Sequence, residues 1–468
     1  MALKTILFAA AFGICVILAL WQPVFGILGY VAHYSIGPER QWWHAPLSGL
    51  GIRYSMFLAA LTAFGIVIRF RKLGIRRPYF LGQERLILLF LGIVWLTVAL
   101  SETTISNPSD AASVHMRVVD HPATKLAKVV FFAMMLTHVI TNLRDYNRLV
   151  WVLIAGSLVL GLQAYSAGRA AFNMGRLESV GGADFMESNM LAAYLAAMLP
   201  IIGIQFMRTS WFGRALCLAS GIFATNAIVL TRSRGSLIGL GVGAVTTVLL
   251  APSKYRGKLI VGLLVVAAGA YYLMDPQFLR RASTINNENR DASVSGRIET
   301  WQASLAMLKD HPLGVGAGNF SQFIGRYDPR FAFRDAHSTY VRCIGELGLE
   351  GALLMLLLIL HAFRVLFGLM RRAKELPQPM RDSVTYASLA LTVSLATLLA
   401  CGLTITLLYV EILWWLLAMP VCLTRVVDNF KIGAATEPKP SSPDDAVKPL
   451  PPRRSSRKKS RQRSASLG

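Results

Sequence analysis

Apolar runs recur along this chain, and they restrict its possible folds more than any other feature. Each run has about 17 to 25 residues, enough to cross a hydrocarbon core of about 30 Å as a helix. Inside a bilayer the backbone must form its own hydrogen bonds, so successive spans have to be helical. Only 16% of the residues are charged, whereas soluble proteins have about 25%. We therefore predict an all-α polytopic membrane protein.

The runs predict about twelve transmembrane helices and one long loop. Apolar character continues past Pro23 to Ile36, so the first region fits one long tilted span or two short ones. We expect an N-terminal bundle (1–274), a loop with short helices (275–338), C-terminal helices (339–425) and a disordered basic tail (426–468). The predicted spans are approximately residues 3–20, 52–70, 86–101, 126–141, 149–167, 189–207, 215–230, 235–251, 259–274, 339–369, 384–401 and 403–423.

Lys and Arg predict the orientation, because cytoplasmic loops are rich in them. They concentrate in the loops near residues 69–85, 144–148, 208–214, 254–258 and 371–381, and in the tail. The opposite, extracytoplasmic side then receives residues 37–51, 102–125, 168–188, 231–234 and the long loop. This bias and the tail account for most of the net charge of +23. We therefore expect contact with membrane lipids and no binding of nucleic acid.

We expect the functional site in the long loop, because a connector of about sixty residues without a function is uncommon. Ile298, Trp301, Leu305 and Leu308 recur at helical spacing and predict an amphipathic helix that could cover the membrane surface. A glycine-rich turn follows at 310–319. Its glycines permit close approach of the backbone to another segment or to a ligand.

His337 stands at the end of this loop, just before an apolar run. An imidazole with an unperturbed pKa of about 6.5 can accept a proton near neutral pH. Asp335 is close enough in sequence to orient it. The residues alone leave open a catalytic base or a structural histidine. His115 and His121 are possible secondary contributors on the same side.

Arginines are unusually frequent on the extracytoplasmic side. Arg232 and Arg234 stand where two spans meet with almost no loop, and an unpaired arginine in the apolar region costs at least about 2.5 kcal/mol. They could extend to the lipid headgroups, or they could bind an anionic ligand, since guanidinium matches phosphate oxygens. Glu411 is another costly charge, with either a proton-relay role or a partner on a neighbouring helix. The five cysteines lack metal-ligand spacing, so neither a metal site nor another cofactor is predicted.

Several motifs in order resemble the O-antigen ligase and polymerase superfamily. They are the residues at 231–236, Gly296 and Arg297 with Trp301, the turn at 311–319, and His337-Ser338-Thr339-Tyr340 followed by the glycine-rich segment 345–351. The family usually has Asn after the histidine, whereas this chain has Ser338. The departure leaves the base in place but puts in doubt any contact made by the missing amide.

The resemblance implies an inverting, metal-independent glycosyltransferase of the multi-span (GT-C-like) class in the bacterial inner membrane, with its site facing the periplasm. Its donor would be a glycan on undecaprenyl pyrophosphate, and its acceptor a hydroxyl of the lipid A-core oligosaccharide. His337 would be the catalytic base. Substrate-binding residues would be Arg234, Arg297, Arg232, Arg176, Asn319 and Tyr340, although structural roles fit the last two equally well.

Other functions stay open. A polymerase of O-antigen or exopolysaccharide repeats, or a protein O-oligosaccharyltransferase, would use the same donor and base. A transporter of lipid-linked glycans belongs to a different class, and it would often show internal repeats, which this sequence lacks. A non-catalytic envelope scaffold would tolerate free substitution in the polar loop.

Overall fold

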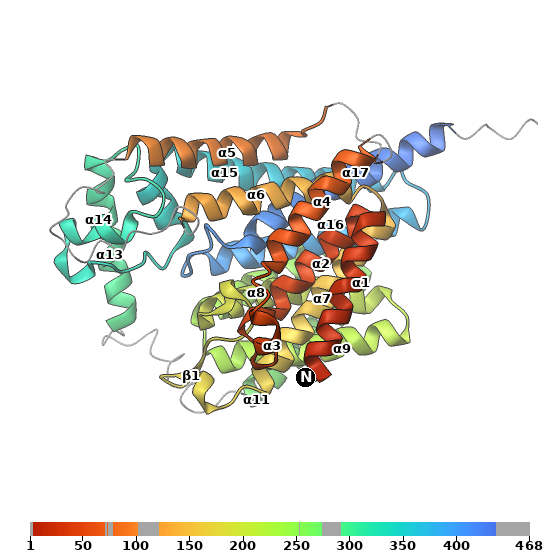
Figure 1. Cartoon of the computed structure of the whole chain (residues 1–468), viewed down its shortest axis with the longest axis horizontal. Coiled ribbons are helices and arrows are strands. Elements are labelled where there is room, and N and C mark those ends of the chain that lie inside the picture. Colours follow the sequence, from red (N-terminus) through yellow and green to blue (C-terminus); the bar gives the residue numbers. More distant parts are fainter. Residues whose placement is uncertain are drawn as a thin grey trace, which may run out of the picture.

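The structure is a computed structural model that describes residues 3–70, 73, 78–101, 121–251, 253–273 and 292–436. It is predominantly helical, with one small antiparallel hairpin in which Asn173 pairs with Arg176 (Figure 1). The elements are α1 (Leu3–Trp21), α2 (Pro23–Ile36), α3 (Ala45–Ser48), α4 (Tyr54–Arg69), α5 (Gly82–Leu100), α6 (Pro122–Val139), α7 (Leu143–Tyr165), β1 (Phe172–Asn173), β2 (Arg176–Leu177), α8 (Ser188–Arg208), α9 (Trp211–Thr231), α10 (Arg234–Leu250), α11 (Ser253–Leu273), α13 (Ala292–Asp310), α14 (Phe320–Tyr327), α15 (Thr339–Ala373), α16 (Met380–Cys401) and α17 (Glu411–Thr436).

Each predicted span overlaps a helix of the structure. Within the described residues, seven helices are long and apolar enough to cross a membrane: α1, α5, α7, α8, α9, α15 and α16. The shorter α4 and α10 are apolar as well. A multi-span helical chain is thus confirmed, while the total of twelve spans stays a prediction. Residues 437–468 of the expected tail lie outside the described residues, and α17 continues to Thr436.

The N-terminal apolar region forms two helices. Gln22 is extended, and Pro23 starts α2 at a position where its missing N–H costs nothing. The helices pack closely, because a Cβ at Gly29 would lie 2.3 Å from Sγ of Cys15. Oγ1 of Thr5 donates to the carbonyl of Trp43 at 2.5 Å, which places the start of α1 near the segment after α2. The region thus forms two helices, and whether both of them span the membrane stays a prediction.

The last helix begins later than predicted. The expected span started at residue 403, whereas α17 starts at Glu411 and residues 402–410 are not helical. Their backbone groups are bound by Thr339 instead: its N–H donates to the carbonyl of Gly402 at 2.8 Å, and its Oγ1 donates to that of Ile405 at 2.7 Å. Buried polar backbone requires such partners. The apolar composition of residues 403–410 predicted a helix, because it gave no sign of these hydrogen-bond partners.

Loops predicted on one side of the membrane meet at one end of the bundle. Nε of Arg176 donates to the carbonyl of Thr231 at 3.1 Å, joining two predicted extracytoplasmic segments. Arg208 donates to Oγ of Ser383 at 2.9 Å, joining two predicted cytoplasmic ones. These contacts support the predicted grouping of the loops. Which end faces the cytoplasm stays a prediction.

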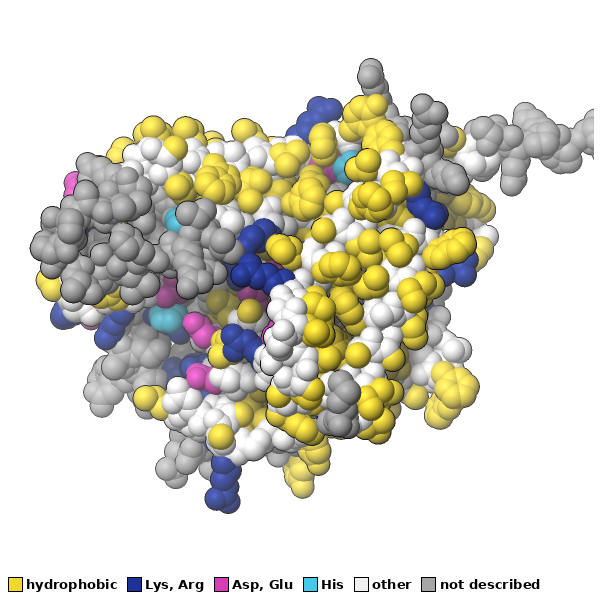
Figure 2. Space-filling model, in the orientation of Figure 1, with side chains coloured by type: hydrophobic (Ala, Val, Ile, Leu, Met, Phe, Trp, Pro, Cys, Tyr) yellow, Lys and Arg dark blue, Asp and Glu magenta, His cyan; other side chains and the backbone are white. Residues whose placement is uncertain are grey.

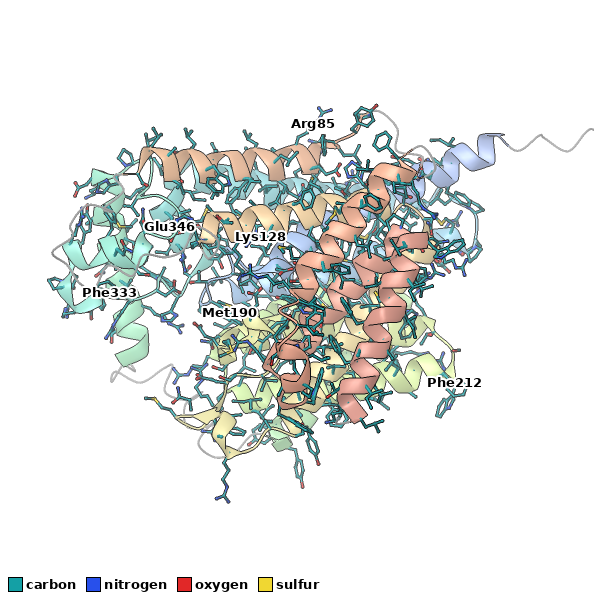
Figure 3. All side chains as sticks on the ribbon, viewed as in Figure 1. Arg85, Lys128, Met190, Phe212, Phe333 and Glu346 are labelled. Carbon is teal, nitrogen blue, oxygen red and sulfur yellow. The ribbon has the colours of Figure 1, made fainter. Side chains whose placement is uncertain are left out.

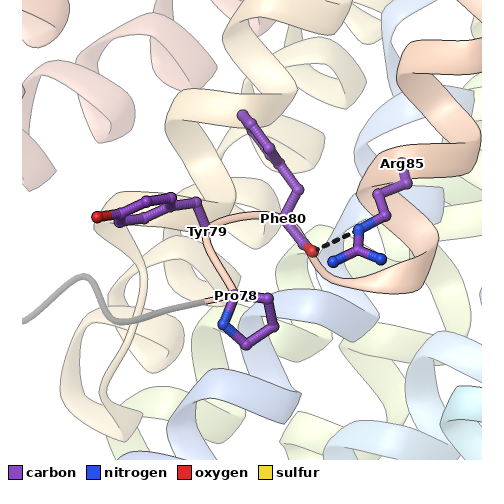
Figure 4. A pocket seen from close by; sticks show the side chains of 4 residues that line it. All are labelled: Pro78, Tyr79, Phe80 and Arg85. Carbon is purple, nitrogen blue, oxygen red and sulfur yellow. Dashed lines mark hydrogen bonds between the residues drawn. The ribbon is translucent and has the colours of Figure 1, made fainter.

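A shallow pocket precedes α5, in the chain segment predicted to be cytoplasmic (Figure 4). It is lined by Pro78, Tyr79, Phe80 and Arg85, and Nε of Arg85 donates to the carbonyl of Phe80 at 3.0 Å. The bond holds the guanidinium against the local backbone. None of the predicted site residues lines this pocket.

Residues 292–336 form what we call the α13–α14 unit, which has its own small core. Met307, Phe320, Phe323 and Phe331 are buried there, and the unit lies beyond the ends of α5 and α15 (Figure 1). The predicted helix exists as α13, and whether its apolar face covers the membrane surface stays a prediction. Thr300, Ser304 and Met307 are buried, whereas Leu305 is 57% exposed. The helix packs its small polar residues inward against α14 and α15, and this packing was not predicted from the sequence.

Candidate functional site

His337 lies in the last turn before α15, with its side chain 46% exposed. Its φ of +46° is rarely adopted by a residue with a Cβ. The next residue, Ser338, caps α15 by accepting from the N–H of Val341 at 3.4 Å. Nε1 of Trp301, on α13, donates to the carbonyl of Ala336 at 3.0 Å. The imidazole is therefore accessible, while the backbone around it is held from two helices.

Asp335 is the acceptor that organises this turn. Its Oδ2 accepts from the backbone N–H of His337 at 3.1 Å and from Oγ1 of Thr406 at 2.5 Å. The same oxygen is 3.8 Å from Nδ1 of His337. Oδ1 accepts from Arg342 at 2.9 Å. The sequence-based expectation that Asp335 lies beside His337 is thus met in the structure.

Arg342 continues the network into the protein. Its Nε donates to Oε1 of Glu346 at 2.9 Å, one helical turn further along α15. The Glu346 side chain is fully buried, and its Oε2 accepts from the hydroxyl of Tyr409 at 2.5 Å. Figure 3 shows Glu346 on the inner side of the α13–α14 unit and Phe333 at its outer edge. The carboxylate of Glu346 is therefore out of direct reach of solvent.

Three of the predicted arginines interact electrostatically across the site. Arg176 donates from Nη2 to Oδ1 of Asn189 at 2.7 Å, in addition to its bond to Thr231. Burial lowers the pKa of Arg297, and the positive charges of Arg176 and Arg234 lower it further. Like charges repel one another. A bound anion would relieve that repulsion.

The electrostatics of His337 connect it with the same arginines. Burial lowers its pKa below the ordinary value of 6.5, and Arg297 and Arg176 act in the same direction. The carboxylates of Asp335 and Glu187 oppose them. Figure 2 shows basic, acidic and histidine side chains gathered in one hollow of the viewed face. The charges of Arg176 and Arg297 thus act on the pKa of His337, and those of Arg176 and Arg234 on the pKa of Arg297.

Arg232 ends α9 in the left-handed conformation, with a φ of +51°. Its guanidinium packs on the hairpin, since a Cβ at Gly175 would lie 2.6 Å from Nη1 of Arg232. The neighbouring residue of that hairpin is Arg176. Arg232 thus lies at the border of the site, and binding of an anion by it stays a prediction.

Asn319 and Tyr340 have partners within the protein. Nδ2 of Asn319 donates to the carbonyl of Val315 at 2.9 Å, and the hydroxyl of Tyr340 donates to that of Leu399 at 2.8 Å. These bonds favour the structural interpretation of both residues. Sugar binding by either residue stays a prediction.

The glycine-rich turn approaches another segment of the chain. Gly348, inside α15, has a φ of +68° that breaks the helix. The break leaves carbonyls free, and the N–H groups of Val315 and Gly316 donate to those of Gly345 and Glu346 at 3.0 and 2.9 Å. A Cβ at Gly314 would lie 2.4 Å from the carbonyl oxygen of Glu346. The turn therefore packs the loop onto α15, which was one of its two predicted uses.

Three charged residues near His337 had no predicted role: Arg342, Glu346 and Glu187. The spacing of Arg342 and Glu346 is that of an ion pair along a helix face, so this pair could have been found in the sequence. Glu187 precedes α8, far from His337 in the chain, and no local pattern marks it. His121 caps α6 by accepting from the N–H of Ala123 at 3.2 Å, and His115 lies outside the described residues.

Comparison with known proteins identifies the segment that carries most of this site. A family model described as O-antigen ligase matches residues 218–356. The match includes Arg232, Arg234, Arg297 and His337, while Arg176 lies outside it. No curated protein matches the chain. The resemblance to the O-antigen ligases is confirmed over this segment, which supports a ligase- or polymerase-type transferase.

Proposed function

We propose that this protein is an O-antigen ligase of the bacterial inner membrane. It would transfer a glycan from undecaprenyl pyrophosphate to a hydroxyl of the lipid A-core oligosaccharide at the periplasmic side. One observation carries the proposal. It is an accessible histidine whose pKa responds to the charges of Arg176 and Arg297. The match of the segment holding His337 and Arg297 to the O-antigen ligase family model supports it.

In this mechanism, His337 accepts the proton of the acceptor hydroxyl. The acceptor oxygen then forms a bond to the anomeric carbon on the face opposite the pyrophosphate, which inverts the configuration. As the bond between that carbon and the pyrophosphate oxygen breaks, its electron pair moves to the leaving group. General-base assistance of this kind contributes about 10²- to 10⁴-fold.

The arginines have the complementary task. Negative charge grows on the pyrophosphate as the glycosidic bond breaks, and fixed guanidiniums stabilise that charge without reorganising. Arg234 and Arg297 would bind the pyrophosphate, with Arg176 and Arg232 beside them. Held in place by Thr231 and Asn189, Arg176 pays little entropy on binding. No metal has a part in this scheme.

A transfer assay with several acceptors tests the proposal. Purified protein would be incubated with undecaprenyl-pyrophosphate-linked glycan and, separately, rough lipopolysaccharide, a second lipid-linked glycan or an acceptor protein, each with and without a chelator. We expect chelator-resistant transfer to rough lipopolysaccharide. Transfer only to the lipid-linked glycan would assign a polymerase, and transfer only to protein would assign a protein O-oligosaccharyltransferase.

The transporter alternative has a separate readout. Proteoliposomes that move the lipid-linked glycan across the bilayer without any transfer product would replace the proposed function by that of a transporter. We favour transfer because the site contains a proton acceptor at its accessible surface. Translocation of an anionic glycolipid needs cations in the membrane but not a base.

A further inference from the structure

We propose that Asp335, Arg342 and Glu346 form a positioning relay that holds His337 in its reactive orientation and increases its basicity. The inference rests on the proposed function, because it assigns these residues to the same reaction. Arg342 and Glu346 touch no substrate in this scheme. They act through Asp335. Glu346 is the member of the relay that lies deepest in the protein, because its side chain is fully buried.

The first step is the conformation of His337. A left-handed backbone is unfavourable for a residue with a Cβ and persists only where surrounding contacts enforce it. The enforcing contact is the bond from the N–H of His337 to Oδ2 of Asp335 at 3.1 Å. Because this oxygen is also 3.8 Å from Nδ1 of His337, one carboxylate fixes the backbone and faces the ring.

The second step is the position of Asp335 itself. Arg342 binds it at 2.9 Å and Glu346 at 2.9 Å, so one guanidinium joins the two carboxylates. A fully buried carboxylate persists only when it is paired, and Glu346 has both Arg342 and the hydroxyl of Tyr409 at 2.5 Å. Arg342 is thereby held at one place and aims at Asp335.

The third step is charge. Two carboxylates and one guanidinium give the relay a net charge of about −1 next to an imidazole that becomes positive as it takes the proton. Asp335 raises the pKa of His337 against the burial and the arginines that lower it. If residue 346 carries no charge, the positive charge of Arg342 is less compensated and disfavours a protonated His337. His337 should then be a weaker base.

The non-helical segment 402–410 explains how the relay is assembled. Thr406 donates to Asp335 at 2.5 Å, and Tyr409 donates to Glu346. Both donors come from the stretch where a continuous helix was expected. Through Thr339, the same stretch is bonded to the start of α15. The segment 402–410 thus holds Asp335, Glu346 and the start of α15 in place around His337.

The decisive variant is Glu346→Gln, which keeps the shape and an acceptor for Tyr409 but removes the charge. The variant weakens the charged hydrogen bond between Arg342 and residue 346, and such bonds are among the stronger ones. We therefore expect kcat to fall about tenfold or more, with an unchanged KM for the lipid-linked donor. The acidic limb of the rate profile should move to lower pH, because a weaker base stays unprotonated there. Glu375→Gln is the matched control: its carboxylate is 67% exposed and binds Lys431 at 2.8 Å. It should leave kcat, KM and the pH profile unchanged.

A second variant keeps the test decisive if Glu346→Gln fails to fold. Thr406→Val is nearly isosteric and removes only the donor to Asp335, so a smaller fall in kcat with the same direction of the pH limb is expected. In a double variant, Asp335→Asn with Glu346→Gln should cost little more than Asp335→Asn alone, since members of one network are not additive.

Failure of this inference and failure of the proposed function give different results. If His337→Ala is inactive while a folded Glu346→Gln or Thr406→Val keeps the wild-type kcat and pH limb, the relay is refuted and the transferase stands. Additive losses in the double variant would also refute the relay. If His337→Ala retains full activity, His337 is not the base, and the relay fails with it although the protein still transfers the glycan. If the wild type forms no transfer product with rough lipopolysaccharide, the proposed function itself fails.

Discussion

Arg234 is the residue whose chemistry most clearly separates a phosphate site from a merely cationic surface. It starts α10 and interacts electrostatically with Arg297. In Arg234→Lys the charge stays but the two-pronged guanidinium is lost. We predict a fall in kcat/KM for the lipid-linked donor of about tenfold or more, as expected for one charged hydrogen bond. Steady-state transfer rates at varied donor concentration measure it.

The matched control is Arg326→Lys. Arg326 lies 4.2 Å over the ring of Phe323 on the α13–α14 unit, so this change should leave the donor kinetics unaltered. Equal kcat/KM values for Arg234→Lys and the wild type would mean that no pyrophosphate oxygen is bound in two-pronged geometry there.

The pH dependence is the second prediction at this scale. Because the pKa of His337 lies below 6.5, the free enzyme should keep its base unprotonated at pH 6.5 and lose activity only as the pH falls through that lower value. The profile of kcat/KM reports the free enzyme. Its acidic limb should therefore lie below pH 6.5. A limb above that value would contradict the assigned electrostatics.

Among the elements, α15 shows why a helix is broken beside the site. Gly348 has a φ of +68°, and a Cβ there would lie 2.5 Å from the carbonyl oxygen of Pro312. We predict that Gly348→Ala destabilises the protein by about 1–3 kcal/mol and reduces transfer, because the turn at 314–316 can no longer pair with α15. Thermal unfolding in detergent and the transfer rate measure both effects.

Gly368→Ala provides the comparison within the same helix. Nothing lies within 4 Å of the Cβ position at Gly368, so the substitution should be neutral or stabilising by up to about 1 kcal/mol. Equal unfolding temperatures for the two variants would show that the break in α15 does not require a glycine at position 348.

The elements also show how far sequence reasoning reaches. The apolar runs predicted the helices because length and hydropathy are local properties, and His337 was found from its place in a polar loop. The buried face of α13 and the late start of α17 were missed. Both depend on partners distant in the chain: α13 buries Thr300 and Ser304, and Thr339 satisfies the backbone at Gly402 and Ile405. Glu187 was likewise beyond reach of any local pattern.

For the whole molecule, the orientation in the membrane is the property most open to measurement. Phe333 is 76% exposed near His337, and Phe212 is 86% exposed between Arg208 and Arg214; the two are well separated in Figure 3. We predict that a cysteine at position 333 reacts with an impermeant maleimide from the periplasm. A cysteine at position 212 should react only after the inner membrane is permeabilised. The reverse pattern would invert the orientation.

The central claim is that one molecule unites a base and a pyrophosphate site and performs transfer with them. A single-turnover assay of wild-type protein and His337→Ala, with saturating lipid-linked glycan and rough lipopolysaccharide, tests it most directly. The account predicts that His337→Ala still binds the donor with unchanged affinity but forms product at least about 10²-fold more slowly. Product formation at the wild-type rate by His337→Ala would contradict it.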